Sequence, residues 1–176
     1  TTGGIVWNAA LVFLRFLQTQ NSLKPNDPKR LLNVEKLKYI VELGSGTGIL
    51  GIALFLCAKI EHIVCTDVAH QMDLIKRNIV RNLDKTQQHH IEAKTLVWGN
   101  HKHYQSFQQT PIDALICSDL LFCAIRTDTV KLLLDALIQL STPNHTVIYF
   151  VFQQRIGWEE KPFFEMAKKA GFQLEQ

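Results

Sequence analysis

The chain has 176 residues, and 47% of them are hydrophobic. That length is usual for one globular domain, and the apolar content is enough for a large central core. The 19 Lys and Arg residues exceed the 16 Asp and Glu residues only slightly, which gives a formal net charge of +3. The most basic stretch, residues 24–38, is diluted by polar residues and is typical of a solvated linker. Nucleic-acid binding is therefore not expected.

The N-terminal region indicates neither membrane insertion nor secretion. Its apolar stretches are interrupted by Arg15 and by polar residues well before bilayer-spanning length, and no cleavable signal pattern is visible. The cysteines lie in apolar stretches and form no metal-ligand spacing with the histidines; they are Cys57, Cys65, Cys117 and Cys123. We expect buried free thiols, no metal, no membrane partner and a cytoplasmic protein, with the nucleus as the alternative compartment.

The first predicted element is a helix with one buried apolar side. Its apolar residues recur at roughly helical spacing between Gly3-Gly4 and Asn21; they are Ile5, Trp7, Ala10, Leu11, Phe13, Leu14 and Leu17. Residues 18–36, which include Pro25 and Pro28, are expected to form an irregular connection. The single domain is thus predicted to consist of an N-terminal helix and linker over residues 1–38 and a core over residues 39–176.

Short apolar strands then alternate with helices. Strands are expected at 39–43, 62–66, 93–97, 113–117 and 146–152, and helices at 49–59, 71–83, 129–140 and 161–170. Gly171 suits the position after the last helix, and 172–174 is expected to start a sixth strand. This alternation is typical of an α/β fold in which a mostly parallel sheet is covered by helices on both faces.

The turn after the first strand is rich in glycine. It has the sequence Glu42-Leu-Gly-Ser-Gly-Thr-Gly48. In a doubly wound sheet, ligands bind beyond the carboxyl ends of the strands, and glycines let the backbone approach them without a Cβ in the way. A dinucleotide-binding loop has the spacing G-x-G-x-x-G, whereas this loop has G-x-G-x-G. We therefore expect Gly44, Ser45, Gly46 and Gly48 to bind a cofactor that has no pyrophosphate.

Two carboxylates indicate which cofactor this is. Glu42 stands two positions before the first glycine, where an acid suits a cationic α-amino group and would repel a pyrophosphate. Asp67 closes the second strand, where a carboxylate can accept hydrogen bonds from both hydroxyls of an adenosine ribose. S-adenosylmethionine has both groups, so the pattern predicts a methyltransferase that uses this cofactor. A nicotinamide-dependent dehydrogenase, or a tight turn without any ligand, is the less favoured interpretation.

Four stretches resemble the seven-strand protein-lysine methyltransferases of the methyltransferase-like 21 type, and the resemblance spans nearly the whole chain. They are Thr2 to Ala10 with Trp7; Val41 to Gly51, followed by Thr66-Asp67 and by Asn78 and Asn82; Val97-Trp-Gly99; and Ser118-Asp-Leu-Leu-Phe122. The first and the last discriminate best, because methyltransferases of every substrate class share the glycine loop. The resemblance implies a Rossmann-like class I methyltransferase fold and a protein substrate such as a chaperone or translation factor.

The resemblance also implies roles for single residues. It places Trp7 over the methionine end of the cofactor, Trp98 near the adenine and Ser118 beside the sulfonium, while Asp119 and Phe122 line the entry of the lysine side chain. From the residues alone, Trp7 and Phe122 are also consistent with core positions. We further hypothesise that Asp119 accepts a hydrogen bond from the substrate nitrogen and that the Phe122 ring favours the deprotonated amine.

The chain departs from the family pattern at two points. Phe122 stands where many relatives have Tyr, which argues against a mechanism that needs a phenolic hydroxyl there. The family fold closes with an antiparallel hairpin, and the chain stops at Gln176 inside its first strand, so we expect the hairpin to be incomplete. By contrast, Arg155 and the pair Phe163-Phe164 resemble the stretch after the fifth strand in the family.

Two alternatives to lysine methylation stay open. The acceptor is then a protein arginine, a protein histidine or a small molecule, with the same cofactor and fold. The other alternative is a non-catalytic module that keeps the fold and binds a partner through the N-terminal helix or through residues 25–36.

Overall fold

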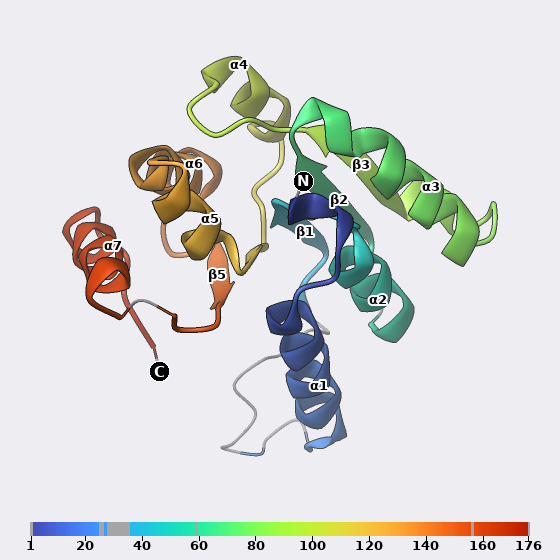
Figure 1. Cartoon of the computed structure of the whole chain (residues 1–176). Helices are drawn as coiled ribbons and strands as arrows, with labels where there is room; N and C mark the ends of the chain where they lie inside the picture. Colours follow the sequence, from blue (N-terminus) through green and yellow to red (C-terminus); the bar gives the residue numbers. More distant parts are fainter. Residues whose placement is uncertain (1, 25–26, 28–35, 59, 156, 176) are drawn as a thin grey trace.

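A parallel sheet forms the centre of the computed structural model, which describes residues 2–24, 27, 36–58, 60–155 and 157–175 (Figure 1). Within these residues the sheet has five strands in the order β3-β2-β1-β4-β5, and all neighbours are parallel. The strands are β1 (Tyr39–Leu43), β2 (His62–Asp67), β3 (Ile91–Thr95), β4 (Ala114–Ser118) and β5 (Val147–Val151).

Helices cover both faces of the sheet (Figure 1). One face packs against α1 (Asn8–Ser22), α2 (Ile49–Cys57) and α3 (Met72–Asn82), and the other against α4 (His101–Tyr104), α5 (Leu120–Arg126), α6 (Val130–Leu140) and α7 (Gly157–Lys169). Short 3-10 turns are η1 (Thr2–Gly4), η3 (Ala69–Gln71), η4 (Gln88–His90) and η5 (Gln105–Phe107). The predicted α/β architecture is confirmed.

The two cores follow from the pleat of the strands. In β1, Ile40 belongs to the core under α1, α2 and α3, and Val41 belongs to the core on the opposite face. Ile63 and Val64 of β2 alternate in the same way, because successive side chains of a strand point to opposite faces. Both faces of the central strands are therefore apolar, as a parallel sheet between two helical layers requires.

The strand order creates a switch point between β1 and β4. From β1 the chain moves outward to β2 and β3, and it then returns to place β4 and β5 on the other side. Leu43 at the end of β1 lies beside Cys117 near the end of β4, so the loops that follow these two strands diverge from one place. Such a switch point at the carboxyl edge is where open α/β sheets bind ligands.

The predicted boundaries of the third strand and of the first helix differ from those in the structure. The third strand lies two residues earlier than predicted, because Thr95 is the last residue that pairs with β2, opposite Asp67. The first helix continues to Ser22, into the expected irregular connection, and the hydroxyls of Thr19 and Ser22 donate to helix carbonyls four residues earlier. Within the remainder of that connection, residues 25–26 and 28–35 lie outside the described residues.

The end of the chain was also predicted incorrectly in part. Gly171 does terminate α7 as expected: its φ is +98°, and its N–H donates to the Lys168 carbonyl. Residues 172–175 form no strand. The Phe172 N–H donates to the Ala167 carbonyl instead, which closes the helix in a Schellman motif and uses the donor that a strand would need. The sequence pattern also did not predict α4 and α5.

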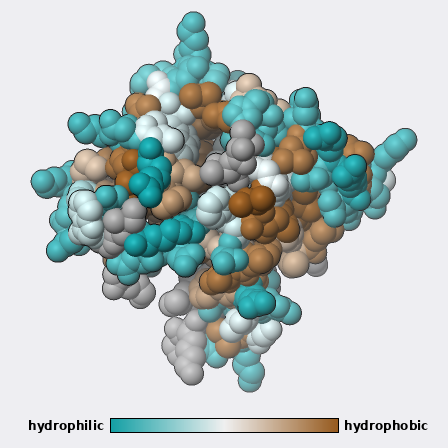
Figure 2. Space-filling view, viewed as in Figure 1, coloured by the Kyte–Doolittle hydropathy of each residue, from teal (hydrophilic) through white to brown (hydrophobic). Residues whose placement is uncertain are grey.

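Some residues expected in the core lie at the surface. Ile5 and Leu11 are 58% and 42% exposed, and Cys57 is exposed, whereas Cys65 and Cys117 are buried free thiols as predicted. Figure 2 shows hydrophobic surface that runs from α2 toward the start of α1, where Val6 and Leu56 are also exposed. Among the described helices, none is both long enough and apolar enough to cross a membrane.

Candidate active site

The glycine loop, residues 44–48, adopts a backbone that glycine favours. Gly44, Gly46 and Gly48 have φ angles of +57°, +55° and +74°, in the left-handed region. A Cβ on Gly44 would collide with the side chain of Leu120, which follows β4. The N–H of Ser45 donates to the Thr66 carbonyl at 2.9 Å, so the loop is also fastened to β2. The loop thus lies at the switch point, between the ends of β2 and β4.

Asp67 contacts this loop directly. Its Oδ2 accepts a hydrogen bond from the Gly46 N–H at 2.8 Å, and its Oδ1 accepts one from the Val68 N–H at 2.7 Å. The carbonyl of Asp67 accepts from the N–H of Leu96 at 2.8 Å, which places the segment of Trp98 beside the same edge. Trp98 itself packs, partly buried, against the core under α4 and α6. The structure therefore places the glycine loop next to Asp67, the residue that is predicted to bind the ribose.

Glu42 lies beneath the start of α2. Because Glu42 is two residues after Ile40 on β1, its side chain points to the same face of the sheet, toward α2. It is only 3% exposed, and its Oε2 accepts a hydrogen bond from the Gly51 N–H at 3.1 Å. Gly51 is in the first turn of α2, whose N–H groups lack partners within the helix. Burial raises the pKa of Glu42 from 4.5 to about 7, although hydrogen bonds from Ser45, Gly51 and Cys65 act in the opposite direction.

Asp119 forms a buried ion pair with Arg155. The carboxylate accepts from Nη1 at 2.7 Å and from Nη2 at 2.8 Å, and Asp119 is 4% exposed. The hydrogen bonds with Asp119 raise the pKa of the Arg155 guanidinium above its usual value. The guanidinium carbon lies 4.7 Å from the centre of the Phe122 ring and 5.5 Å from that of Trp7. Trp7 from the first motif, and Asp119 and Phe122 from the last, thus surround one side chain.

Ser118 ends β4 immediately before this cluster. Its Oγ is buried and has no hydrogen-bond partner among the described residues. Burying a hydroxyl without a partner is costly, so such a group in a native protein calls for an explanation. The position next to the glycine loop and to Asp119 makes Ser118 a candidate ligand-binding residue.

Some residues of the site were missed or undervalued in the sequence. Thr66, fully buried at the end of β2, donates from Oγ1 to the Glu42 carbonyl at 2.7 Å. Asn78 donates from Nδ2 to the Thr47 carbonyl at 2.8 Å and so supports the loop from α3. Arg155 is indicated only by the family resemblance. Thr66 could have been predicted as a site residue because it is a polar residue at the end of an apolar strand. No feature of the sequence predicts that Arg155 pairs with Asp119.

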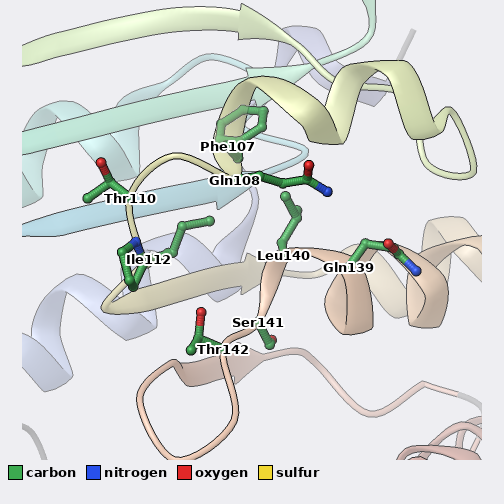
Figure 3. Close-up of a pocket in the computed structure, with 9 residues that line it drawn as sticks. Phe107, Gln108, Thr110, Ile112, Gln139, Leu140, Ser141 and Thr142 are labelled. Atoms are coloured by element: carbon green, nitrogen blue, oxygen red, sulfur yellow. The ribbon is translucent and has the colours of Figure 1, made fainter.

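In the described part of the chain, one cavity lies between α2 and α3 and another at the amino edge of the sheet. One of about 380 Å³ lies beside the glycine loop and is lined by Val6, Thr47, Ile49, Ile52, Ala53, Leu56, Asn78 and Asn82. The other, of about 170 Å³, is lined by residues that precede β4 and by the end of α6 (Figure 3). Because this second cavity lies at the amino edge of the sheet, it is separate from the candidate site.

Solved structures with the same fold include O-methyltransferases. EvdMO1 matches with a TM-score of 0.58 and 15% sequence identity over 96% of this chain and 38% of its own. An O-methyltransferase family protein from Burkholderia thailandensis matches with a TM-score of 0.55 and 12% identity over 79% of this chain and 38% of its own. The strand order and the glycine loop at the switch point, together with these structures, define a Rossmann-like class I methyltransferase fold.

Sequence comparison gives the family. Residues 1–170 match the lysine methyltransferase family, and the chain belongs to it. Protein N-lysine methyltransferase METTL21A of Xenopus tropicalis is 26% identical over 93% of this chain and 66% of its own length. Protein-lysine N-methyltransferase EFM6 of Saccharomyces cerevisiae is 27% identical over 95% and 70%. EEF1A lysine methyltransferase 3 of Xenopus tropicalis is 29% identical over 81% and 54%. The chain thus spans between 54% and 70% of the length of these relatives.

Proposed function

We propose that this protein transfers a methyl group from S-adenosylmethionine to a lysine side chain of a protein substrate. The observation that carries the proposal is the gathering of two groups of residues at one sheet edge. The glycine loop with Asp67 forms one group, and Trp7, Asp119 and Phe122 form the other. Membership of the lysine methyltransferase family supports the same chemistry.

The residues present fit the cofactor. The missing Cβ atoms of the glycine loop leave its backbone open, and the buried Ser118 hydroxyl offers an unused hydrogen bond. We assign Asp67 to the ribose, Trp98 to the adenine, Trp7 to the methionine end and Ser118 to the neighbourhood of the sulfonium. When bound, S-adenosylmethionine supplies an activated methyl group. Gly44, Ser45, Gly46 and Gly48 form the floor of the site.

We assign Glu42 to cofactor binding because it holds the glycine loop in position. Its Oε2 holds the Gly51 N–H, so the carboxylate fixes the start of α2 relative to β1. The loop between them, residues 44–48, is thereby held in place on both sides. The predicted contact of Glu42 with the cationic amino group uses the same carboxylate, which retains further lone pairs for it.

The acceptor amine must be neutral and must lie in line with the methyl group. Lysine has a usual pKa of ~10.4, and an apolar environment lowers that value. The Phe122 ring provides such an environment, and the Asp119 carboxylate accepts a hydrogen bond that aims the nitrogen lone pair. Catalysis then depends on orientation more than on acid–base chemistry. Phe122 has no hydroxyl, which agrees with this division of roles.

The relatives suggest the first substrate to test. The name of EEF1A lysine methyltransferase 3 gives EEF1A, a translation elongation factor, as the protein that it methylates. We propose a protein substrate of this kind, either a translation factor or a chaperone, and a cytoplasmic site of action. A membrane or a nucleic acid is not part of the proposal.

Methylation assays with labelled cofactor test this function. The protein is incubated with S-adenosylmethionine carrying a labelled methyl group and with elongation factor 1A, a chaperone preparation or a cell extract. We expect label in protein that acid hydrolysis releases as methyl-lysine. Label in a small molecule, in arginine or in histidine would instead identify another acceptor. Failure to bind both S-adenosylmethionine and its demethylated product in calorimetry would favour a non-catalytic module.

The role of Asp119 is tested in the same assay. Asp119→Ala is expected to lower turnover by about 10²-fold, since misplacing a reacting group by about 1 Å costs this much, while binding of the demethylated product is retained. Near-normal turnover would remove Asp119 from the mechanism. Loss of cofactor affinity would reassign Asp119 to the cofactor.

A further inference from the structure

Arg155 takes the place that the proposed function gives to the substrate amine. Its guanidinium lies against Asp119 with two hydrogen bonds and over the faces of Phe122 and Trp7. A carboxylate and two aromatic faces are the groups that bind an alkylammonium ion. The site is therefore built for a cation, and a cation of the chain itself fills it.

The hydrogen bonds of Asp119 show how fully it is engaged. Oδ1 accepts from Arg155 Nη1 and, at 3.4 Å, from the Gln153 N–H, while Oδ2 accepts from Arg155 Nη2. With 4% of Asp119 exposed, little of the carboxylate faces solvent. A second cation at the same oxygens would lie beside the guanidinium and be repelled by it.

The side chain of Arg155 has a way out of this position. It is 22% exposed and is carried by residues 152–155, which form no helix or strand between β5 and α7. Its own backbone N–H is anchored, because it donates to Glu160 Oε1 at 2.9 Å. Rotation of the side chain about this fixed backbone, with loss of the hydrogen bond from Nη2 to Gln153 Oε1 at 3.2 Å, would remove the guanidinium from Asp119.

We propose that Arg155 is an internal occupant of the acceptor pocket, which a substrate lysine must displace before its nitrogen reaches Asp119. This inference rests on the proposed function. It makes Arg155 a specificity-determining residue: a free alkylamine or an isolated lysine competes poorly with the tethered guanidinium. A protein substrate competes because its surrounding contacts add binding free energy to the exchange.

Chemical complementation tests the proposal without a known substrate. Arg155→Ala is titrated with n-propylguanidine, which replaces the missing side chain, and with n-butylamine, which represents lysine. Tryptophan fluorescence and the thermal midpoint report binding. We expect both probes to bind the variant at least about tenfold more tightly than the unchanged protein, as a desolvated cation–π contact with a charge-assisted hydrogen bond allows.

Arg126→Ala is the matched control. The Arg126 guanidinium carbon also lies over the Phe122 ring, at 5.6 Å from its centre. The Arg126 side chain, however, is exposed, and among the described residues the ion pair of Asp119 is with Arg155 and not with Arg126. Its removal should not improve the binding of either probe. The double variant with Arg155→Ala and Asp119→Asn should lose the gain, because the charged acceptor is absent.

Three results would overturn the inference: equal probe affinity in Arg155→Ala and in the unchanged protein, an equal gain in Arg126→Ala, or a gain that survives Asp119→Asn. Should Arg155→Ala fail to fold, Arg155→Met, which keeps the apolar stem between the rings, is titrated in its place with guanidine and methylamine, which are short enough to reach Asp119 beside that stem. Calorimetry with the demethylated cofactor separates the two proposals. Probe binding without cofactor binding refutes the methyltransferase function alone, and the reverse result refutes the role of Arg155 alone.

Discussion

Glu42 is a carboxyl group held in the interior by the first turn of a helix. The amide of Gly51 stabilises its charged form, but burial outweighs that effect and raises the pKa to about 7. Near neutral pH the group therefore exchanges between a charged form, which can attract an ammonium group, and a neutral form. An exposed glutamate, with a pKa of ~4.3, would be charged throughout this range.

Replacing Glu42 by glutamine should change how stability depends on pH. The folded pKa lies above the unfolded one, so the folded state binds the proton more tightly. The resulting stabilisation is complete below about pH 4 and is lost as the pH rises through about 7. Between pH 5 and 8 the free energy of unfolding of Glu42→Gln should gain about 2.5 kcal/mol relative to the unchanged protein. Urea unfolding across this range measures the difference.

Asp73→Asn serves as the control for this series. Asp73 is an exposed acid in the first turn of α3, and no buried carboxyl is removed with it. Its stability difference should stay nearly constant from pH 5 to 8. Parallel pH curves for Glu42→Gln and the unchanged protein would contradict the raised pKa of Glu42.

At the scale of elements, the N-terminal turn η1 lies against the glycine loop. A Cβ on Gly46 would lie 3.2 Å from the Gly3 carbonyl oxygen, and a Cβ on Gly3 would collide with the buried side chain of Gln71. The turn is therefore held between the loop and the start of α3. This contact joins the first motif of the chain to the proposed cofactor floor.

Gly3→Ala and Gly4→Ala form a matched pair for this contact. Gly3→Ala must displace the amide group at the end of the Gln71 side chain, which is only 6% exposed, whereas nothing lies within 4 Å of a Cβ on Gly4. We expect Gly3→Ala to lower the affinity for the demethylated cofactor about tenfold, the result of roughly 1.4 kcal/mol of overpacking. Gly4→Ala should leave the affinity unchanged. Calorimetry measures both, and equal affinities would place the cofactor away from the turn.

At the scale of the whole molecule, the sheet is anchored at its centre. β1 pairs with both β2 and β4, while β5 pairs only with β4 in the described part of the chain. Val147 at the start of β5 is 47% exposed, whereas Ile40, Val41 and Leu43 of β1 are fully buried. Local stability should therefore decrease from the central strands toward this edge.

Hydrogen exchange provides the corresponding measurement. The amides of β1 and β4 should exchange most slowly, through global unfolding, and those of β5 should exchange faster through local opening. The amides of β2 are the internal control, since this strand also has two neighbours. Protection of β5 equal to that of β1 would show that the edge is covered in solution.

The sequence pattern predicted those features of the fold that depend on local order. β1 is Tyr39–Leu43, as predicted, and the helix predicted at 71–83 is α3 (Met72–Asn82), which buries Met72, Ile75 and Ile79 on one side. Apolar periodicity and glycine spacing are properties of neighbouring residues, so they are visible without the fold. The third strand was misplaced because its end depends on where β2 stops pairing.

By itself, the sequence determined an α/β protein with a glycine loop and two acids at strand ends, and it indicated the methyltransferase class. Only the tertiary structure decided what those side chains face. Glu42 lies under α2 because of the strand pleat, and Asp119 is held by Arg155, 36 residues away. Contacts of this kind depend on how strands and helices pack in three dimensions, and no local periodicity encodes such a distant pairing.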